Sequence, residues 1–359
     1  MNHVLHIIDH NGLGGAQTIV KGIVEQNPDT HHVYFLNTKD HAIEIHSTHI
    51  TRNQCARWDI FSHIRFIQSY IVTHDITVIH CHLSFANAIG IFLKRIFFPH
   101  ITLVIHEHGK IFQQDKPYTR LLKQFSQQID SVIAISQATA DHLQTKTGIS
   151  PSKIKLLYNF VDLERFNLDN VAPIPELRAQ YDVPLDSFVV GFAGRLTKRK
   201  GWREFVQASL ILTRTHPNLH FVIAGDGEDK QDLLMLTQDN PQIQYVGYVS
   251  DMPAFYAMLD CFVIPSHWEP MGLTEIEAQA MGVPVISANV SALNEIIQDG
   301  ENGLLFEAGN SNDLSQKIQQ IQEDVPLRKN LISKSSKTSQ NYSLQRYIQN
   351  LQNLYVLDK

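Results

Sequence analysis

Short runs of β-branched and other apolar residues alternate with helical patterns in the first half of the chain. The runs at residues 4–8, 33–36, 78–81, 103–106 and 132–135 have the composition of strands that are buried on both faces. Between the second and third runs, isoleucine recurs at helical spacing at positions 60, 64, 67 and 71. This alternation predicts βαβ units and a parallel sheet.

The same pattern restarts after a stretch that is rich in proline. Residues 163–187 contain three prolines and few strand formers, which is typical of a linker. Apolar runs then return at 188–192, 221–224, 245–246, 261–264 and 283–287, with helical patterns such as 202–213 and 273–281 between them. The stretch 342–357 repeats apolar residues at helical spacing and predicts a terminal amphipathic helix.

These patterns predict an α/β protein with two Rossmann-like, doubly wound domains that face each other across a cleft. Residues 1–165 form the first domain, on which we expect the helix at 342–359 to pack back, and residues 166–341 form the second. Sheets of this kind bind ligands at the carboxyl ends of their strands. We therefore expect the functional residues in the strand-to-helix turns.

Composition narrows the class of protein. The formal net charge of −6 over 359 residues disfavours a general nucleic-acid binder, which needs a basic excess. Three scattered cysteines, at positions 55, 81 and 261, form no disulfide framework and favour a reducing compartment. The first residues lack the pattern of a signal peptide, and no apolar run has the length of a membrane span. We expect a cytoplasmic protein, or one attached peripherally to the inner face of the cytoplasmic membrane.

The first candidate turn, residues 12–16, reads Gly-Leu-Gly-Gly-Ala between a strand and a helix. Its glycines allow a ligand to approach the backbone, and the free N–H groups of a helix start favour an anion. The turn lacks the third glycine of a dinucleotide fingerprint, and the second strand leads into Asn37 rather than an acidic residue. A tight turn without a ligand is the alternative interpretation.

The second candidate turn lies at residues 191–201 and contains Gly194, Arg195 and Lys200. Two cations at the end of a strand suit a diphosphate, because arginine offers a planar fork and lysine a point charge. A solvated basic surface is the alternative.

The third candidate turn, residues 265–278, carries the most information. Glu269 precedes a helix that begins near Gly272 and Leu273. Leu273, Thr274 and Glu277 share one face of this helix, and its start favours a phosphate. Glu277 has the reach to accept hydrogen bonds from the two hydroxyls of a ribose. Glu269 lies where a sugar beyond the phosphates would lie. Capping and solvation are the alternative roles for these glutamates.

Histidines cluster at the ends of two predicted strands. Alternation puts His106 and His108 on one face, and His80 and His82 lie on the preceding strand. A zinc site is one interpretation, but 19 histidines make coincidental pairs common and no third-ligand pattern appears. We favour a catalytic or substrate-orienting role for His106 and expect no metal site.

The motifs of the two halves are Gly14-Gly15, His106, Gly194-Arg195, Lys200, Gly225-Asp226-Gly227 and the stretch from Glu269 through Gly272 to Glu277. Taken together, these motifs resemble glycosyltransferase family four, whose members are retaining enzymes of the GT-B fold. The resemblance covers nearly the whole chain. It implies that Arg195 and Lys200 grip a donor diphosphate with the backbone amides of Leu273 and Thr274. It implies further that Glu277 holds the ribose, Glu269 and His106 contact the transferred sugar, and Gly15 lets the first loop close.

The resemblance implies a reaction as well. A UDP- or GDP-sugar would donate its sugar to a glycan or lipid-linked acceptor, in bacterial polysaccharide or lipopolysaccharide biosynthesis, with retention of configuration. The chain has no Asp-x-Asp pattern for a divalent metal. Arg195 and Lys200 would therefore stabilise the leaving diphosphate, and we expect neither a metal nor another cofactor. The alternatives are a sugar-nucleotide epimerase or hydrolase on the same fold, and a non-catalytic GT-B scaffold.

Residues 84–125 form a locally basic stretch. Six basic residues and two acidic ones leave a charge of +4, and apolar residues lie among them. Such a mixture on helix surfaces suits an anionic membrane. The alternative is that the apolar residues pack the helices onto the sheet while the cations are solvated. The basic residues are Lys94, Arg95, Lys110, Lys116, Arg120 and Lys123, and the acidic ones are Glu107 and Asp115.

Overall fold

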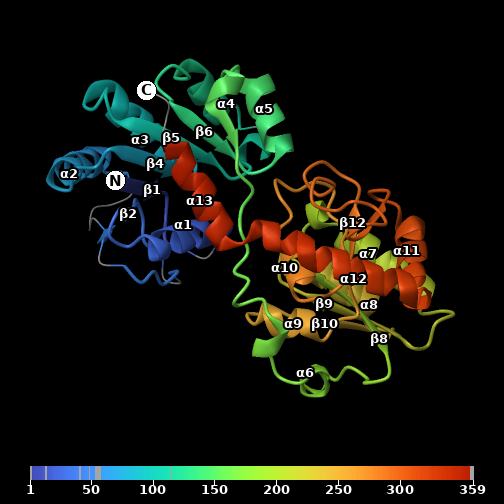
Figure 1. The fold of residues 1–359 in the computed structure, drawn as a ribbon. Coiled ribbons are helices and arrows are strands. Elements are labelled where there is room, and N and C mark those ends of the chain that lie inside the picture. Colours follow the sequence, from blue (N-terminus) through green and yellow to red (C-terminus); the bar gives the residue numbers. More distant parts are fainter. Residues whose placement is uncertain are drawn as a thin grey trace. The chain divides into compact units, whose positions relative to one another are not determined.

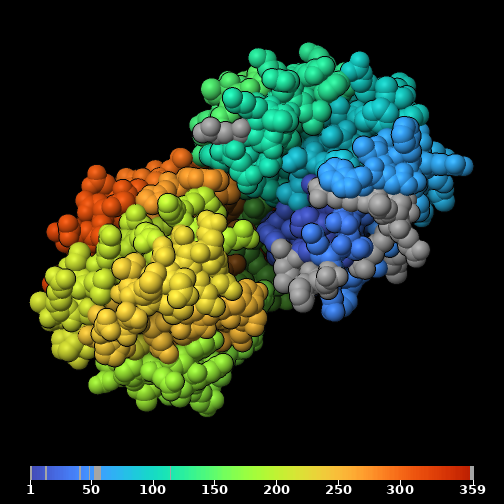
Figure 2. Space-filling model, turned by 180° about the vertical axis from the view of Figure 1, so that it is seen from behind, coloured from blue at the N-terminus to red at the C-terminus, as the bar shows by residue number. Residues whose placement is uncertain are grey.

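The computed structural model describes residues 2–12, 14–39, 42–47, 49–52, 58–113 and 115–355. The chain divides into two compact units, Met1–Asn159 with Gln345–Lys359, and Phe160–Leu344. Figure 2 shows one surface of each unit, blue to blue-green for the N-terminal unit and yellow-green to orange for most of the C-terminal unit. Leu13 in the first glycine turn and Cys55 lie outside the described residues.

The boundary between the units lies a few residues before the expected one between 165 and 166. The backbone N–H of Val161 donates to the carbonyl oxygen of Tyr342 at 2.9 Å. The ring of Phe166 packs against Tyr256, with the centroids 6.1 Å apart. These contacts attach the segment after Asn159 to the second unit, so Arg165 belongs to the C-terminal unit.

The N-terminal unit contains a parallel sheet of seven strands in the order β3-β2-β1-β4-β5-β6-β7. The five predicted strands are present within one or two residues of their expected bounds. The edge strands β3 and β7 escaped prediction because each has three residues, too few to form an apolar run. The strands are β1 (Val4–Ile8), β2 (His31–Phe35), β3 (Ile50–Arg52), β4 (Val78–His82), β5 (Thr102–Glu107), β6 (Ser131–Ala134) and β7 (Ile154–Leu156).

Helices cover both faces of this sheet (Figure 1). One face packs with α2, α3 and α5 in a large core around Ile67, Ile79 and Leu103, and the other packs with α1 around Val20 and Val33. The helix α13 belongs to this unit from Gln345 onward, and its Tyr355 hydroxyl lies 2.7 Å from Nδ1 of His80 in β4. The helices are α1 (Gly15–Gln26), α2 (Ile60–Thr73), α3 (Ser84–Ile96), α4 (Lys116–Gln124), α5 (Gln137–Thr147) and α13 (Leu344–Tyr355).

The C-terminal unit repeats this architecture with six parallel strands in the order β10-β9-β8-β11-β12-β13. The strands are β8 (Phe188–Ala193), β9 (Leu219–Ala224), β10 (Ile243–Gly247), β11 (Cys261–Ile264), β12 (Val285–Ala288) and β13 (Leu304–Phe306). Only β13, a short edge strand, has no counterpart in the prediction for this half. The helices are α6 (Ile174–Gln180), α7 (Trp202–Leu212), α8 (Lys230–Thr237), α9 (Met252–Ala257), α10 (Leu273–Ala280), α11 (Ser311–Glu323) and α12 (Val325–Ser339).

The helix α6 lies within the stretch 163–187, whose prolines had indicated only a linker. Pro173 precedes the helix and Pro175 lies in its first turn, where a proline costs no hydrogen bond. Arg178 anchors it, because its guanidinium pairs with Asp260 at 2.7 Å and donates to three backbone carbonyls. Within the described residues, none of the helices combines the length and the apolar character needed to cross a bilayer.

Candidate functional site

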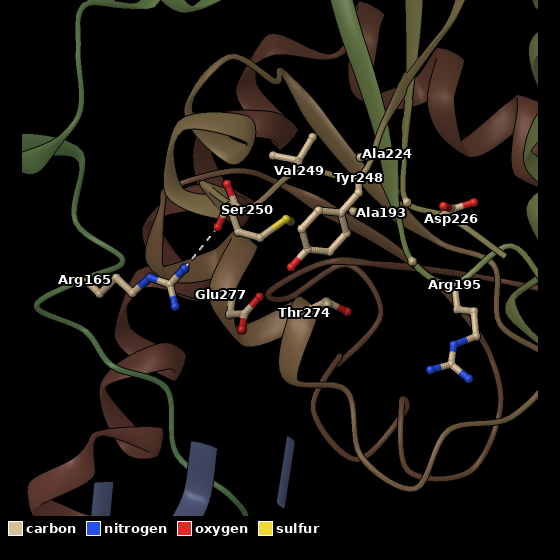
Figure 3. Close-up of a pocket in the computed structure, with 13 residues that line it drawn as sticks. Arg165, Ala193, Arg195, Ala224, Asp226, Tyr248, Val249, Ser250, Thr274 and Glu277 are labelled. Atoms are coloured by element: carbon tan, nitrogen blue, oxygen red, sulfur yellow. Dashed lines mark hydrogen bonds between the residues drawn. The ribbon is translucent and has the colours of Figure 1, made fainter. Parts of the chain in front are cut away.

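A pocket of about 610 Å³ lies at the carboxyl ends of β8, β9 and β10 in the C-terminal unit. Its walls come from the turns after β8, β9 and β10, from one face of α10, and from Arg165 in the segment before the sheet (Figure 3). This is the edge at which doubly wound sheets bind ligands. The lining residues are Arg165, Ala193, Gly194, Arg195, Ala224, Gly225, Asp226, Tyr248, Val249, Ser250, Met252, Thr274 and Glu277.

Two glycine-containing turns meet at one wall of the pocket. Gly225 has a φ of +132°, and a Cβ added there would lie 1.9 Å from the carbonyl oxygen of Gly194. The backbone N–H of Leu196 donates to the carbonyl oxygen of Asp226 at 2.9 Å, which joins the two turns. A side chain at position 225 would therefore push the turns apart, and the Gly-Asp-Gly motif at 225–227 has a structural reason.

Thr274 and Glu277 of α10 both line the pocket (Figure 3). Leu273, which we expected on the same helix face, is not among the lining residues. Glu277 Oε2 accepts a hydrogen bond from the Tyr256 hydroxyl at 2.9 Å. Burial raises the pKa of Glu277 to about 7, although the Tyr256 hydroxyl and the Arg165 charge act in the opposite direction. Gly272 precedes α10 without a side-chain cap in the described structure, so the first-turn N–H groups of Leu273 and Thr274 are suited to bind an anion.

The raised pKa of Glu277 predicts that donor affinity depends on pH. Below pH 7 the carboxyl of Glu277 is protonated, and it accepts hydrogen bonds from the hydroxyls of a ribose poorly. We expect the Kd for a nucleotide-sugar to rise about tenfold per pH unit below 7 and to be constant above it. Calorimetric titrations from pH 5.5 to 8.5 would measure this profile, because the diphosphate of a nucleotide-sugar does not titrate in that range.

Two variants make the pH test specific. Glu277→Gln should bind more weakly and show a flat profile, while Glu228→Gln, an exposed acid outside the pocket, should keep the wild-type slope. A wild-type slope in Glu277→Gln would show that another group causes the pH dependence.

Lys200 and Glu269 lie together outside this set of lining residues. Lys200 Nζ is 2.5 Å from Glu269 Oε1, and Arg199 Nη1 is 2.9 Å from Glu269 Oε2. The Ser266 hydroxyl donates to Glu269 Oε1 at 2.8 Å. Burial acts to raise the pKa of Glu269, but Lys200 and Arg199 hold it below its ordinary value, so the carboxylate is ionised at neutral pH. The cation expected at the diphosphate is therefore paired with the carboxylate expected at the sugar.

The remaining predicted site residues lie in the N-terminal unit. His106 of β5 is buried, and neither of its ring nitrogens has a hydrogen-bond partner among the described residues. Burial, followed by the neighbouring His108, holds its pKa well below the ordinary value. Gly15 is the first residue of α1, and a Cβ added there would meet no atom within 4 Å. The donor and sugar contacts of His106 and Gly15 stay predictions.

The structure adds residues that the sequence analysis missed. Tyr248, Val249 and Ser250 follow β10 directly, so the rule that led to the other turns would have found them too. No such signal marked Arg165, because it lies in a segment between the two sheets that is neither helix nor strand. Its Nη2 donates a hydrogen bond to the carbonyl oxygen of Ser250 at 3.5 Å, beside the pocket. Tyr256 and Arg199, the partners of the two glutamates, were also missed.

Comparison with known proteins agrees with this geometry. The family described as Glycosyltransferase Family 4 matches residues 13–165, and the family described as Glycosyl transferases group 1 matches residues 173–338. The capsular polysaccharide biosynthesis glycosyltransferase CapM of Staphylococcus aureus is 33% identical over 235 residues, which cover 62% of this chain and 60% of CapM. The lipopolysaccharide core biosynthesis glycosyltransferase LpsE of Rhizobium meliloti is 33% identical over 164 residues, 45% of this chain and 47% of LpsE. Both alignments thus span less than two thirds of the relative.

A solved structure extends the likeness over the whole fold. Anabaena HepE, solved in complex with UDP, superposes with a TM-score of 0.85 at 22% identity and covers 99% of this chain and 100% of HepE. This likeness and the two doubly wound sheets confirm the predicted α/β fold of the GT-B class. With one family match on each sheet, the chain belongs to glycosyltransferase family four.

Proposed function

We propose that this protein moves a sugar from a UDP- or GDP-sugar to a glycan or lipid-linked acceptor in the synthesis of a bacterial polysaccharide or lipopolysaccharide. The observation that carries the proposal is the pocket at the ends of β8, β9 and β10, with Arg195 on one side and Thr274 and Glu277 on the other (Figure 3). The names of CapM and LpsE and the UDP bound by HepE support the same class of donor and product.

The donor would lie in the pocket in a defined direction. Glu277 would accept hydrogen bonds from the ribose hydroxyls, and the wall of the pocket formed by Tyr248, Val249 and Ser250 would face the base. Arg195 and the free N–H groups at the start of α10 would bind the diphosphate. The transferred sugar would extend toward Glu269 and Lys200, and His106 would contact it from the N-terminal unit.

The reaction would proceed with retention and without a metal. The bond between the anomeric carbon and the diphosphate oxygen breaks, the acceptor oxygen bonds to that carbon from the same face, and the acceptor proton passes to the leaving phosphate. Negative charge grows on the diphosphate during this step, so fixed cations and helix N–H groups bind the transition state more strongly than the donor. No other cofactor is required.

The family match supports transfer over the alternatives of epimerase, hydrolase and non-catalytic scaffold. An epimerase or hydrolase needs an acid and a base beside the reacting carbon. Glu269 is ionised and held by two cations, which suits binding and not proton transfer. A non-catalytic scaffold would not require the ionisable side chains of Arg195 and Glu277 in the pocket.

A donor screen tests the proposal. UDP- or GDP-sugars should raise the melting temperature of the protein, because a ligand that binds only the native state stabilises it. The selected donor should release its nucleotide in the presence of an acceptor extract, and mass spectrometry should detect the glycosylated product. Release of free sugar at the same rate without acceptor would indicate a hydrolase, and no shift with any nucleotide-sugar would contradict the donor site.

The basic stretch at 84–125 supports a peripheral membrane location as part of the proposal. Some of its apolar residues, including Ile91 and Leu122, are buried in the core, whereas Phe92, Ile96 and Phe97 are exposed. Lys94 and Lys110 are taken up by ion pairs with Asp130 and Asp115. Among the described residues, three cations of α4 form no ion pair and line a hollow with Lys146. They are Lys116, Arg120 and Lys123.

This surface predicts binding to anionic vesicles. The protein should co-sediment at low salt with vesicles that contain phosphatidylglycerol, and high salt should release it. Arg120→Glu should weaken the binding about tenfold or more, because each charge near such a surface contributes about 1 kcal/mol. Neutral phosphatidylcholine vesicles and the variant Lys155→Glu, on the edge strand β7, serve as controls. Equal recovery in the supernatant with and without anionic vesicles would leave a soluble acceptor as the remaining possibility.

A further inference from the structure

A cluster of buried histidines lies on the N-terminal sheet, beside the predicted sugar contact His106. In the strand register, His6 of β1 lies opposite His80 of β4, and His82 of β4 lies opposite His106 of β5. Side chains two residues apart on a strand share a face, so these four imidazoles lie on one side of the sheet. All four are buried. Burial of several imidazoles together is costly unless their nitrogens are satisfied.

Three of these rings converge. One ring nitrogen from each of His6, His80 and His82 lies within 4.8 Å of the others. His6 Nδ1 is 3.0 Å from His82 Nε2, and His80 Nε2 has no hydrogen-bond partner among the described residues. Ligand nitrogens of a tetrahedral zinc ion with bonds of about 2.0–2.1 Å lie at comparable separations.

The opposite nitrogen of each ring has its own partner. His80 Nδ1 is 2.7 Å from the Tyr355 hydroxyl of α13. His6 Nε2 is 2.9 Å from His31 Nδ1, and His82 Nδ1 is 3.0 Å from His108 Nε2. Histidines that bind metals usually hold the second ring nitrogen in such a hydrogen bond, which sets the ring orientation and the tautomer.

We propose that His6, His80 and His82 bind one divalent transition-metal ion of the zinc class, through Nδ1 of His6 and Nε2 of His80 and His82. Imidazole nitrogens favour Zn²⁺, Co²⁺, Ni²⁺ or Cu²⁺ and not Mg²⁺ or Ca²⁺, which take oxygen ligands. Because the three ligands are neutral, water or hydroxide would complete the tetrahedron and reduce the charge.

A second convergence, of His82, His106 and His108, overlaps the first at His82. In that group, the ring nitrogen of His82 that does not bind the metal would hydrogen-bond to His6. Neither ring nitrogen of His106 has a hydrogen-bond partner among the described residues that would fix the orientation of the ring. The first group is therefore the better metal site. Burial lowers the pKa of His6, His80 and His82 well below the ordinary value, which keeps their lone pairs available at neutral pH.

The inference is independent of the proposed transfer reaction. The ion would join β1 to β4 and, through Tyr355, would hold α13 on the sheet. It would stabilise the N-terminal unit and take no part at the donor diphosphate, so the transfer step would still need no metal. The competing explanation is a chain of hydrogen bonds from His31 through His6 and His82 to His108, in which each imidazole donates to the next.

Cobalt substitution distinguishes the two. The full chain, purified without a histidine tag and freed of metal with a chelator, should bind one Co²⁺ and develop the intense visible bands of a four-coordinate ion. Zn²⁺ should bleach these bands and raise the melting temperature by several degrees, and Mg²⁺ should do neither. A wild-type chain that develops no such bands would overturn the proposal.

A matched pair of variants locates the site. His80→Gln should lose the cobalt bands and the zinc shift. His63→Gln is the control, because His63 is also buried in this unit and also bonds a tyrosine hydroxyl through Nδ1, at 2.7 Å from Tyr34. Circular dichroism checks that both variants fold, and His6→Gln replaces His80→Gln if the latter does not. Cobalt bands that persist in the folded variants of His80 and His6 would overturn the proposal.

Discussion

Replacing Arg195 with alanine should lower kcat/KM for sugar transfer by about a hundredfold to a thousandfold. Loss of a preorganised group that stabilises charge in the transition state typically costs this much. Arg195 lines the pocket opposite α10 and is exposed, so the substitution should leave the melting temperature nearly unchanged (Figure 3). Initial rates at varied donor concentration, with the selected nucleotide-sugar, would measure the effect.

The same assay tests metal independence. Transfer by the wild type should continue in excess EDTA. Added Mg²⁺ should raise the transfer rate of neither the chelated wild type nor the Arg195→Ala variant. Lys198→Ala is the matched control, because Lys198 is an exposed cation of the same turn that does not line the pocket. If chelation abolishes transfer and Mg²⁺ restores it, a metal and not Arg195 stabilises the leaving diphosphate.

Replacing Glu269 with alanine should affect both stability and turnover. The buried carboxylate is the shared partner of Lys200 and Arg199, so its loss leaves two cations facing each other. Removing one side of a buried ion pair typically costs about 3–5 kcal/mol, and we expect about 3 because both cations retain partial access to solvent. Loss of the hydrogen bonds to the sugar should lower kcat by a further ten- to a hundredfold.

Urea unfolding and kcat at saturating donor would separate the two effects. Glu204→Ala is the control, since Glu204 pairs with the half-exposed His267 at 3.2 Å in the same region. The double variant Lys200→Ala/Glu269→Ala should be less destabilised than the sum of the single variants, because it removes both charges. Additive losses of stability would contradict the ion pair of Glu269 with Lys200, and an unchanged kcat in Glu269→Ala would contradict its contact with the sugar.

The sequence alone predicted the longer strands of both sheets and two of the turns that line the pocket, the one after β8 and the one that leads into α10. Continuous β-branched runs mark strands buried on both faces, and this signal does not depend on what packs against them. It failed at β3, β7 and β13, whose three residues are too few to form a run. It also failed at α6, where prolines that suit a helix start resembled those of a linker.

The partners of the site residues were decided by the tertiary structure. Glu277 of α10 meets Tyr256 of α9 through the packing of helices, and Glu269 meets Lys200 because β11 pairs with β8. A linear pattern specifies neither arrangement. The resulting burial and charge set the pKa of Glu277 near 7 and keep Glu269 ionised, although both are glutamates of one turn. The histidines show the same principle. Their spacing predicted shared faces, but only the pairing of β1 with β4 brought His6 beside His80 and His82, because residues distant in sequence become neighbours when strands pair.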